Sequence, residues 1–189
     1  DPYVSSKLPL PDTTSADLKI QLTVKNHSSK NIDGKLIGKI GDIKFETPVS
    51  LSSLETKTVN LDPSIISSLQ IKNPKLWWPN GYGEQNLYDV KLEFVSNDGK
   101  ISDTKEFKTG IREMSYSEEG GALKIWVNGK RFIARGGNWG FSESNLRYRS
   151  REYDIAVRYH KEMNLNMLRN WVGQTGDDEF FEACDKYGI

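Results

Sequence analysis

The sequence predicts a mostly β fold, in which an immunoglobulin-like β-sandwich is followed by a β-hairpin and the first two βα units of an incomplete (β/α)8 barrel. Three observations lead to this prediction. Runs of alternating apolar and polar residues, separated by turn-forming residues, fill positions 1–110. Asn128-Gly129 stands between two apolar runs, which is the strongest short-range signal for a hairpin. Beyond it, two short strand-like runs alternate with two stretches of helical periodicity, which is typical of parallel strands joined by helices.

The first predicted domain, residues 1–110, contains strands with no amphipathic helix between them. The strand-like segments are residues 18–24, 35–40, 43–49, 56–61, 88–94 and a last strand that ends near Thr109. Gly41-Asp42 separates the second from the third at a spacing that suits a hairpin, and residues 62–69 fit either one helical turn or a loop. Such strands predict an antiparallel β-sandwich, held by apolar packing because the antibody-type cysteine pair is absent.

The second predicted domain, residues 111–189, begins with a hairpin formed by residues 123–127 and 131–135. The elements after it are a helix over residues 151–163, a strand over 167–171 and a helix over 178–187. Strand, helix, strand, helix is the opening of a βα repeat, and two such units cannot close an eight-stranded barrel.

The composition excludes several classes of partner. The chain has 26 basic and 26 acidic residues, so no long-range field favours nucleic acid or a membrane surface, and a neutral partner fits best. No apolar run approaches the roughly 18 residues that span a bilayer, and residues 1–4 lack the basic and apolar regions of a secretory signal. The compartment stays unknown, since a periplasmic, extracellular or lysosomal parent protein is compatible with this sequence.

Several residues that invite a functional assignment have simpler explanations. His160 falls on an apolar helix face with no second ligand at metal spacing, so we expect a satisfied interior or interface histidine and no metal site. Cys184 lies in the apolar stripe of the last helix and is expected to be an inert core thiol. Glu143 is expected to be a solvated loop charge. Asn26-His27-Ser28 fits the glycosylation pattern, which is common by chance.

Polar side chains at the C-terminal ends of the two predicted parallel strands are the best candidates for a binding site. The active site of a βα barrel lies at these strand ends. Asn138 and Arg169 are polar residues at these ends, where the fold alone gives little reason for a polar side chain. Trp139 and Trp171 fit either a binding role or a core role, and the glycine pair before Asn138 fits relief of crowding.

The motifs that carry a family resemblance run through most of the chain. They are Leu76-Trp-Trp-Pro-Asn-Gly-Tyr-Gly-Glu-Gln-Asn-Leu-Tyr88, Gly110-Ile-Arg112, Val127-Asn-Gly-Lys130, Arg135-Gly-Gly-Asn-Trp139, Met163-Asn-Leu-Asn-Met-Leu-Arg-Asn-Trp171 and Phe181-Glu-Ala-Cys-Asp-Lys-Tyr-Gly188. In this order they resemble the successive motifs of glycoside hydrolase family 2, and within it the β-mannosidase and exo-β-glucosaminidase branch. Val172-Gly173-Gln174 replaces the glycine-rich run that many members carry there, so the substrate stays open.

The resemblance implies a retaining β-glycosidase that hydrolyses O-glycosidic bonds, with β-mannoside-type substrates favoured. Retention needs two carboxyl groups roughly 5 to 5.5 Å apart, one as acid/base and one as nucleophile. In the family these Glu residues end the fourth and seventh strands of a TIM-barrel catalytic domain, and the acid/base follows an asparagine. Asn-Glu occurs nowhere in this sequence, so no catalytic residue is assigned and the chain alone is predicted to be inactive. No metal or organic cofactor is implied.

The resemblance also implies a set of substrate-binding residues at the barrel rim. They are Asn138, Trp139, Arg169, Asn170 and Trp171. Arg169 has the firmest assignment, because family members place an arginine here to hold the sugar or the catalytic machinery by charge-assisted hydrogen bonds. The expected partners are therefore a β-glycoside and the remainder of the barrel.

A second class of function stays open, namely a non-catalytic carbohydrate-binding or spacer module in which Trp77, Trp78 and Tyr82 would meet a glycan. Because Pro79 follows the tryptophan pair inside the predicted sandwich, packing is the favoured interpretation of both rings. Two open barrel units would also leave apolar faces uncovered. The region after Ile111 is therefore expected either to be less protected than the sandwich or to be shielded by self-association.

Overall fold

The computed structural model describes residues 2–140, 148 and 150–189, so the predicted loop charge Glu143 lies outside the described residues. The chain forms two compact units. The first contains the residues up to Pro74 together with Tyr88–Ile111, and the second contains Lys75–Leu87 and the residues from Arg112 onward. The predicted mostly β fold is confirmed. In the described part of the chain, no helix is long and apolar enough to cross a membrane.

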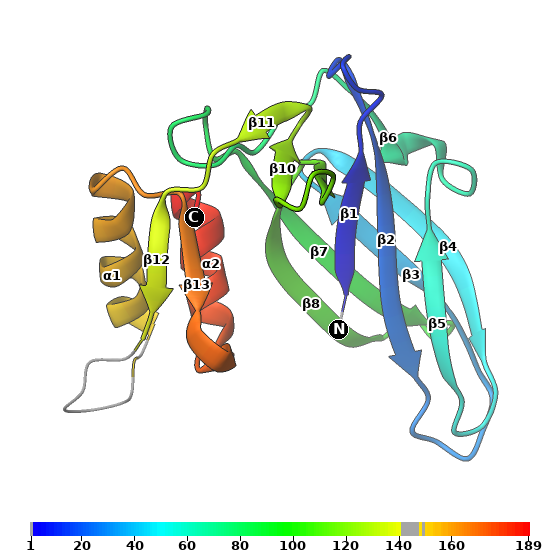
Figure 1. Cartoon of the computed structure of the whole chain (residues 1–189). Helices are drawn as coiled ribbons and strands as arrows, with labels where there is room; N and C mark the ends of the chain where they lie inside the picture. The colour runs from blue at the N-terminus through cyan, green and yellow to red at the C-terminus, as the bar shows by residue number, and fades with distance from the viewer. Residues whose placement is uncertain (1, 141–147, 149) are drawn as a thin grey trace. The chain divides into compact units, whose positions relative to one another are not determined.

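Two four-stranded sheets build the first unit, and Figure 1 shows them as two layers. One sheet contains β1 (Tyr3–Lys7), β2 (Ser15–Lys25), β5 (Thr56–Leu61) and β6 (Gln70–Lys72), and the other contains β4 (Ile43–Leu51), β3 (Ile32–Ile40), β7 (Leu87–Ser96) and β8 (Ile101–Gly110). β3 and β4 pair antiparallel up to Ile40 opposite Ile43, so Gly41-Asp42 forms the predicted hairpin. The undecided segment 62–69 contains the short 3₁₀ helix η1 (Ser67–Leu69).

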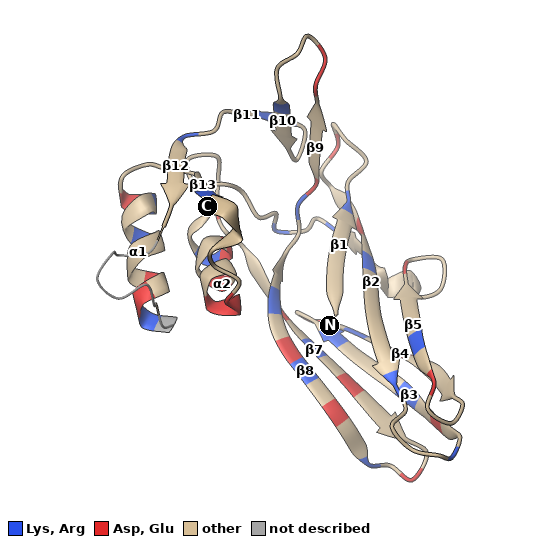
Figure 2. Cartoon of the chain, turned by 60° about the horizontal axis from the view of Figure 1, so that its bottom comes forward, with Lys and Arg blue, Asp and Glu red and all other residues tan. Residues whose placement is uncertain are grey.

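Apolar side chains on alternate residues of these strands form the core of the first unit. Along β2, Ala16, Leu18 and Ile20 are at most 1% exposed, whereas the residues between them face solvent. The other sheet contributes the buried residues Leu36, Ile40, Phe45, Val49, Val90 and Leu92. Figure 2 shows basic and acidic residues interspersed along β7 and β8 rather than gathered by sign.

Asn26, the first residue of the glycosylation-like tripeptide, is used inside the first unit. Its side chain is 2% exposed. The amide nitrogen donates to the main-chain oxygens of Lys30 at 2.7 Å and Ser52 at 2.8 Å, and the amide oxygen accepts from the main-chain nitrogen of Ser28 at 2.9 Å. The amide therefore stabilises a turn after β2 and lies in the protein interior.

The second unit contains a small antiparallel sheet and a parallel strand pair with two helices. The antiparallel strands are β9 (Met114–Ser117), β10 (Lys124–Val127) and β11 (Lys130–Phe132). Asn128 and Gly129 have φ values of 50° and 77°, as a two-residue hairpin between β10 and β11 requires. The remaining elements are β12 (Gly136–Trp139), α1 (Ser150–Glu162), β13 (Met167–Asn170), the 3₁₀ helix η2 (Trp171–Gly173) and α2 (Asp178–Tyr187).

β12 and β13 pair in parallel, with Gly136 opposite Met167. A Cβ atom on Gly136 would lie 1.8 Å from the main-chain oxygen of Met167, so only glycine allows the two strands to approach this closely. Gly137 has no atom within 4 Å of its virtual Cβ, so crowding explains only the first glycine of the pair. Both helices pack against these strands around a shared core of Trp139, Tyr153, Val157, Phe180 and Ala183.

The segment of residues 75–87 belongs to the second unit, whereas the sequence prediction placed it inside the sandwich. Its Trp77 is 3% exposed and donates from Nε1 to the main-chain oxygen of Asp185 in α2 at 2.6 Å. Asn80 donates from Nδ2 to the main-chain oxygens of Lys161 and Leu165, at the end of α1. The segment packs with the second unit because the last carbonyls of a helix need donors, and residues 75–87 supply donors to both helices.

A candidate sugar-binding edge

The C-terminal ends of β12 and β13 bring together the polar residues singled out in the sequence. The parallel register sets Asn138 opposite Arg169 and Trp139 opposite Asn170. Successive side chains of a strand point to opposite faces, so the four residues separate into an exposed pair, Asn138 and Arg169, and a pair turned toward the interior. The predicted site is thus divided between two faces of the strand pair.

Arg169 is held in place by two neighbours. Its Nη1 atom donates to the side-chain oxygen of Asn138 at 3.1 Å, and its guanidinium carbon lies 4.4 Å from the centre of the Trp171 ring. A guanidinium has five N–H donors in a planar fork, so a group that is oriented by Asn138 and Trp171 can also donate to hydroxyl groups of a ligand. Trp171 is 43% exposed and offers aromatic surface beside these donors.

Trp139 lies in the core, which is one of the two roles that the sequence left open for it. It is 4% exposed, and its ring centre lies 4.9 Å from that of Phe180 and 5.6 Å from that of Tyr148. Its Nε1 atom donates to Oγ1 of Thr175 at 2.9 Å. The side chain is enclosed by its neighbours, because an aromatic ring at this position closes the helix-facing core.

Asn170 and Thr175 bracket the turn of residues 171–174. The side chain of Asn170 donates to the main-chain oxygen of Thr175 at 2.7 Å and accepts from its main-chain nitrogen at 3.2 Å. Inside the turn, Val172 has φ 46° and is 77% exposed. A positive φ on a β-branched residue is a strained conformation, and such strain clusters at functional sites.

Two titratable groups around this core have raised pKa values. Burial raises the pKa of Tyr153 to about 12, and the hydrogen bond that its hydroxyl donates to Asp177 adds to the shift. Burial also raises the pKa of Cys184 to about 12, as the prediction of an inert core thiol requires. The nearby ring of His160 has its Nδ1 atom 2.7 Å from the main-chain oxygen of Ala156, so this polar group is satisfied as predicted.

Comparison with known proteins identifies the family of this chain. Residues 1–112, more than half of the chain, match the profile described as Glycosyl hydrolases family 2. The chain belongs to this family.

Relatives of this family 2 chain are glycoside hydrolases. The exo-β-D-glucosaminidase of Streptomyces avermitilis is 35% identical over 190 aligned residues, which cover 100% of this chain and 21% of that protein. The mannosylglycoprotein endo-β-mannosidase of Lilium longiflorum is 40% identical over 119 residues, covering 61% of this chain and 12% of that protein. The family 2 chain therefore spans about a fifth of the length of the first relative.

Solved structures agree with this family assignment. The exo-chitosanase of Amycolatopsis orientalis superposes with a TM-score of 0.85 at 28% identity, over 100% of this chain and 21% of that one. The β-D-mannosidase from Dictyoglomus thermophilum superposes with a TM-score of 0.76 at 27% identity, over 98% of this chain and 23% of that one.

Two features of the family 2 chain were not predicted from its sequence. Thr175 joins Trp139 to Asn170, and the segment of residues 75–87 caps both helices. The opposite orientation of the Asn138 and Trp139 side chains could have been predicted only from the alternation of side chains along a β-strand. In the described residues, no three His, Cys, Asp or Glu side chains gather as ligands for a metal ion.

Proposed function

We propose that this chain is part of a retaining β-glycosidase that acts on β-mannoside-type or β-glucosaminide substrates. The observation that carries the proposal is the exposed trio of Asn138, Arg169 and Trp171, which lies at the ends of two adjacent parallel strands in a chain of glycosyl hydrolase family 2. Relatives named exo-β-D-glucosaminidase and β-mannosidase support the two substrate classes.

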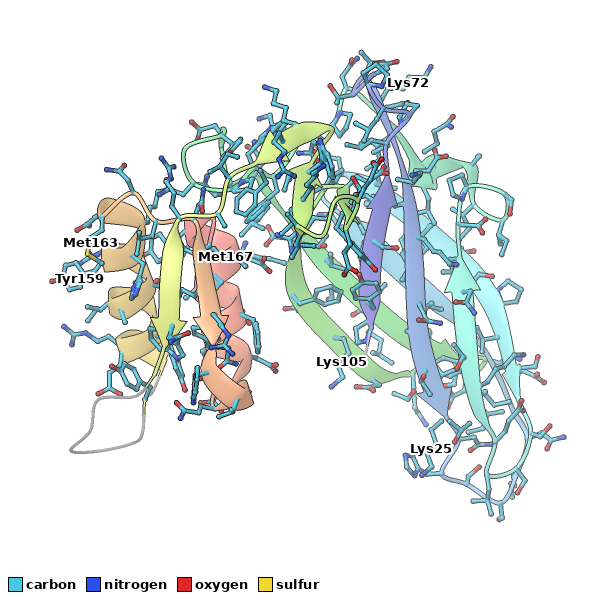
Figure 3. The ribbon with its side chains drawn as sticks, in the orientation of Figure 1. Lys25, Lys72, Lys105, Tyr159, Met163 and Met167 are labelled. Carbon is cyan, nitrogen blue, oxygen red and sulfur yellow. The ribbon has the colours of Figure 1, made fainter. Side chains whose placement is uncertain are left out.

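In this proposal, β12, α1, β13 and α2 are the first two βα units of a barrel. The parallel pairing of β12 with β13, and the helices that follow each strand, support it. Figure 3 shows Tyr159 and Met163 pointing from α1 away from the strand pair, and both are more than half exposed. In a barrel the helices form the outer ring, so these side chains lie on its outer face.

The five predicted binding residues take different roles in the proposed site. Arg169 and Asn138 donate and accept hydrogen bonds at the hydroxyl groups of the sugar, and Trp171 packs on its apolar face. Trp139 and Asn170 act behind them, because Trp139 is 4% exposed and the Asn170 amide is engaged with Thr175. These two residues position the edge and do not touch the ligand.

The catalytic carboxyl groups of the proposed enzyme lie outside this chain, since no residue here corresponds to the family's acid/base or nucleophile. The test compares the purified chain with the whole protein that contains it, using nitrophenyl β-mannoside and nitrophenyl β-glucosaminide. We expect the whole protein to hydrolyse at least one substrate with retention at the anomeric carbon, and the chain to release no nitrophenol above the buffer control. Hydrolysis by the chain, or inversion by the whole protein, would overturn the proposal.

The alternative of a sugar-binding sandwich places a glycan on Trp77, Trp78 and Tyr82, and two of these three rings are engaged within the second unit. Trp77 is 3% exposed, and the guanidinium of Arg112 lies 4.2 Å from its ring centre. The Tyr82 hydroxyl accepts a hydrogen bond from the main-chain nitrogen of Ile133 at 2.8 Å. These rings are packing elements of the second unit, so no observation favours a glycan on them.

A further inference from the structure

Thr175 is the point at which both strand ends and the following turn are joined. The residue is 3% exposed. Its Oγ1 atom accepts from Nε1 of Trp139, the last residue of β12, at 2.9 Å. Its main-chain oxygen and nitrogen pair with the amide of Asn170, the last residue of β13, at 2.7 and 3.2 Å. One buried residue therefore fixes the ends of two strands that are far apart in the chain.

The turn that these bonds close is strained. Val172 has φ 46° and the next residue, Gly173, has φ 67°. Glycine adopts this region freely, whereas a β-branched residue does so only where its surroundings hold it. The main-chain nitrogen of Gln174 donates to the oxygen of Trp171 at 3.1 Å, which closes the turn internally. The bonds from Asn170 and Trp139 to Thr175 supply the external hold.

The strained turn determines where Trp171 and Val172 lie. These residues are 43% and 77% exposed, and the Trp171 ring stacks on the guanidinium of Arg169. If the turn relaxed, Val172 would move to an ordinary backbone conformation and would carry Trp171 away from Arg169. The exposed edge would then lose the adjacent aromatic face and hydrogen-bond donors.

We propose that Thr175 is a positioning residue of the sugar-binding edge, which holds the turn of residues 171–174 in its strained form so that Trp171 and Val172 contact the apolar face of a pyranose ring. This inference rests on the proposed function, because it names the residue that aligns the same edge. Thr175 itself is buried and touches no ligand. The hydroxyl is the decisive group, since the main-chain bonds to Asn170 do not depend on the side chain.

The test is a double-mutant cycle in the whole glycosidase, combining Thr175→Val with Val172→Gly, and Thr175→Ser serves as the matched control. We expect Thr175→Val to raise KM for the nitrophenyl glycoside about tenfold, which is the effect of losing one net hydrogen bond. Thr175→Ser keeps the acceptor and should keep the wild-type value. When Val172→Gly is already present, the same Thr175→Val change should cost less, because glycine needs no external hold.

Tryptophan emission and the melting temperature confirm that each variant is folded before kinetics are compared. An equal KM for Thr175→Val and the wild type would overturn the inference. So would an equal rise in KM from Thr175→Val with and without the Val172→Gly change. A wild-type enzyme that hydrolyses neither nitrophenyl glycoside would instead refute the proposed function, so the two failures are distinguishable.

Discussion

Replacing Asn80 tests whether residues 75–87 stabilise the second unit. The Nδ2 atom of Asn80 donates to the main-chain oxygens of Lys161 at 3.0 Å and Leu165 at 2.8 Å. α1 ends at Glu162, so the Lys161 oxygen is one of its last carbonyls, and it also accepts from the main-chain nitrogen of Asn164 at 2.9 Å. Asn80→Ala removes both bonds. The Lys161 oxygen keeps its bond from Asn164, so the cost falls on the partly buried Leu165 oxygen, and we expect a loss of about 2 kcal/mol in the free energy of unfolding.

The assay is urea unfolding followed by tryptophan emission. All five tryptophans of the chain, Trp77, Trp78, Trp126, Trp139 and Trp171, belong to the second unit. Their emission therefore reports on the unfolding of this unit. Asn80→Asp should cost at least as much, because it would place a carboxylate oxygen against two carbonyl oxygens.

Asn31→Ala is the matched control. The side chain of Asn31 is an exposed amide of the first unit that accepts from the main-chain nitrogen of Ser53 at 3.1 Å. Its loss should leave the tryptophan transition unchanged. If both Asn80 variants shift the free energy by less than about 0.5 kcal/mol, the range of ordinary surface substitutions, the assignment of this segment as a helix cap is wrong.

Two further predictions concern the core of the second unit. Gly136→Ala should lower the free energy of unfolding of the second unit by at least about 2 kcal/mol through overpacking. Gly137→Ala is the control, because a Cβ atom there would meet no atom within 4 Å, and it should not lower this free energy. Equal urea midpoints for the two variants would contradict the close approach of β12 and β13. Burial raises the pKa of Cys184 from 9.0 to about 12, so the thiol ionises at lower pH in the unfolded chain than in the folded one. The free energy of unfolding that this burial contributes is fully present below pH 9 and should fall as the pH rises toward 12. Between pH 8 and 10 the loss in the free energy of unfolding is about 1 kcal/mol, and Cys184→Ala should reduce this loss. An identical pH dependence of the urea midpoint in the Cys184→Ala variant and the wild type would contradict burial of the thiol.

Local signals in the sequence predicted much of the fold. The hairpins at Gly41-Asp42 and Asn128-Gly129 appear as predicted, because two-residue turns of this kind depend on the turn residues themselves. The placement of residues 75–87 was not predictable in this way, since their partners lie about 80 to 110 residues later in the chain. Helix caps supplied from such a distance leave no periodic pattern.

The candidate site was predicted in outline only. Asn138 and Arg169 lie together because parallel strands share one C-terminal edge. The family resemblance implied the same surface for Trp139, although neighbours on a strand point to opposite faces. Thr175 could not be identified, because its role depends on the conformation of the turn before it and on a bond to a residue 36 positions earlier.

The most direct test of the proposed site is the effect of Arg169→Ala on kcat/KM of the whole enzyme. Loss of charge-assisted hydrogen bonds to the sugar should lower kcat/KM about 10- to 100-fold. Arg158→Ala is the control, because Arg158 is exposed on α1 and forms an ion pair with Glu162 of the same helix at 3.5 Å. Equal kcat/KM values for Arg169→Ala, Arg158→Ala and the wild-type enzyme would contradict the claim that the ends of β12 and β13 face the substrate.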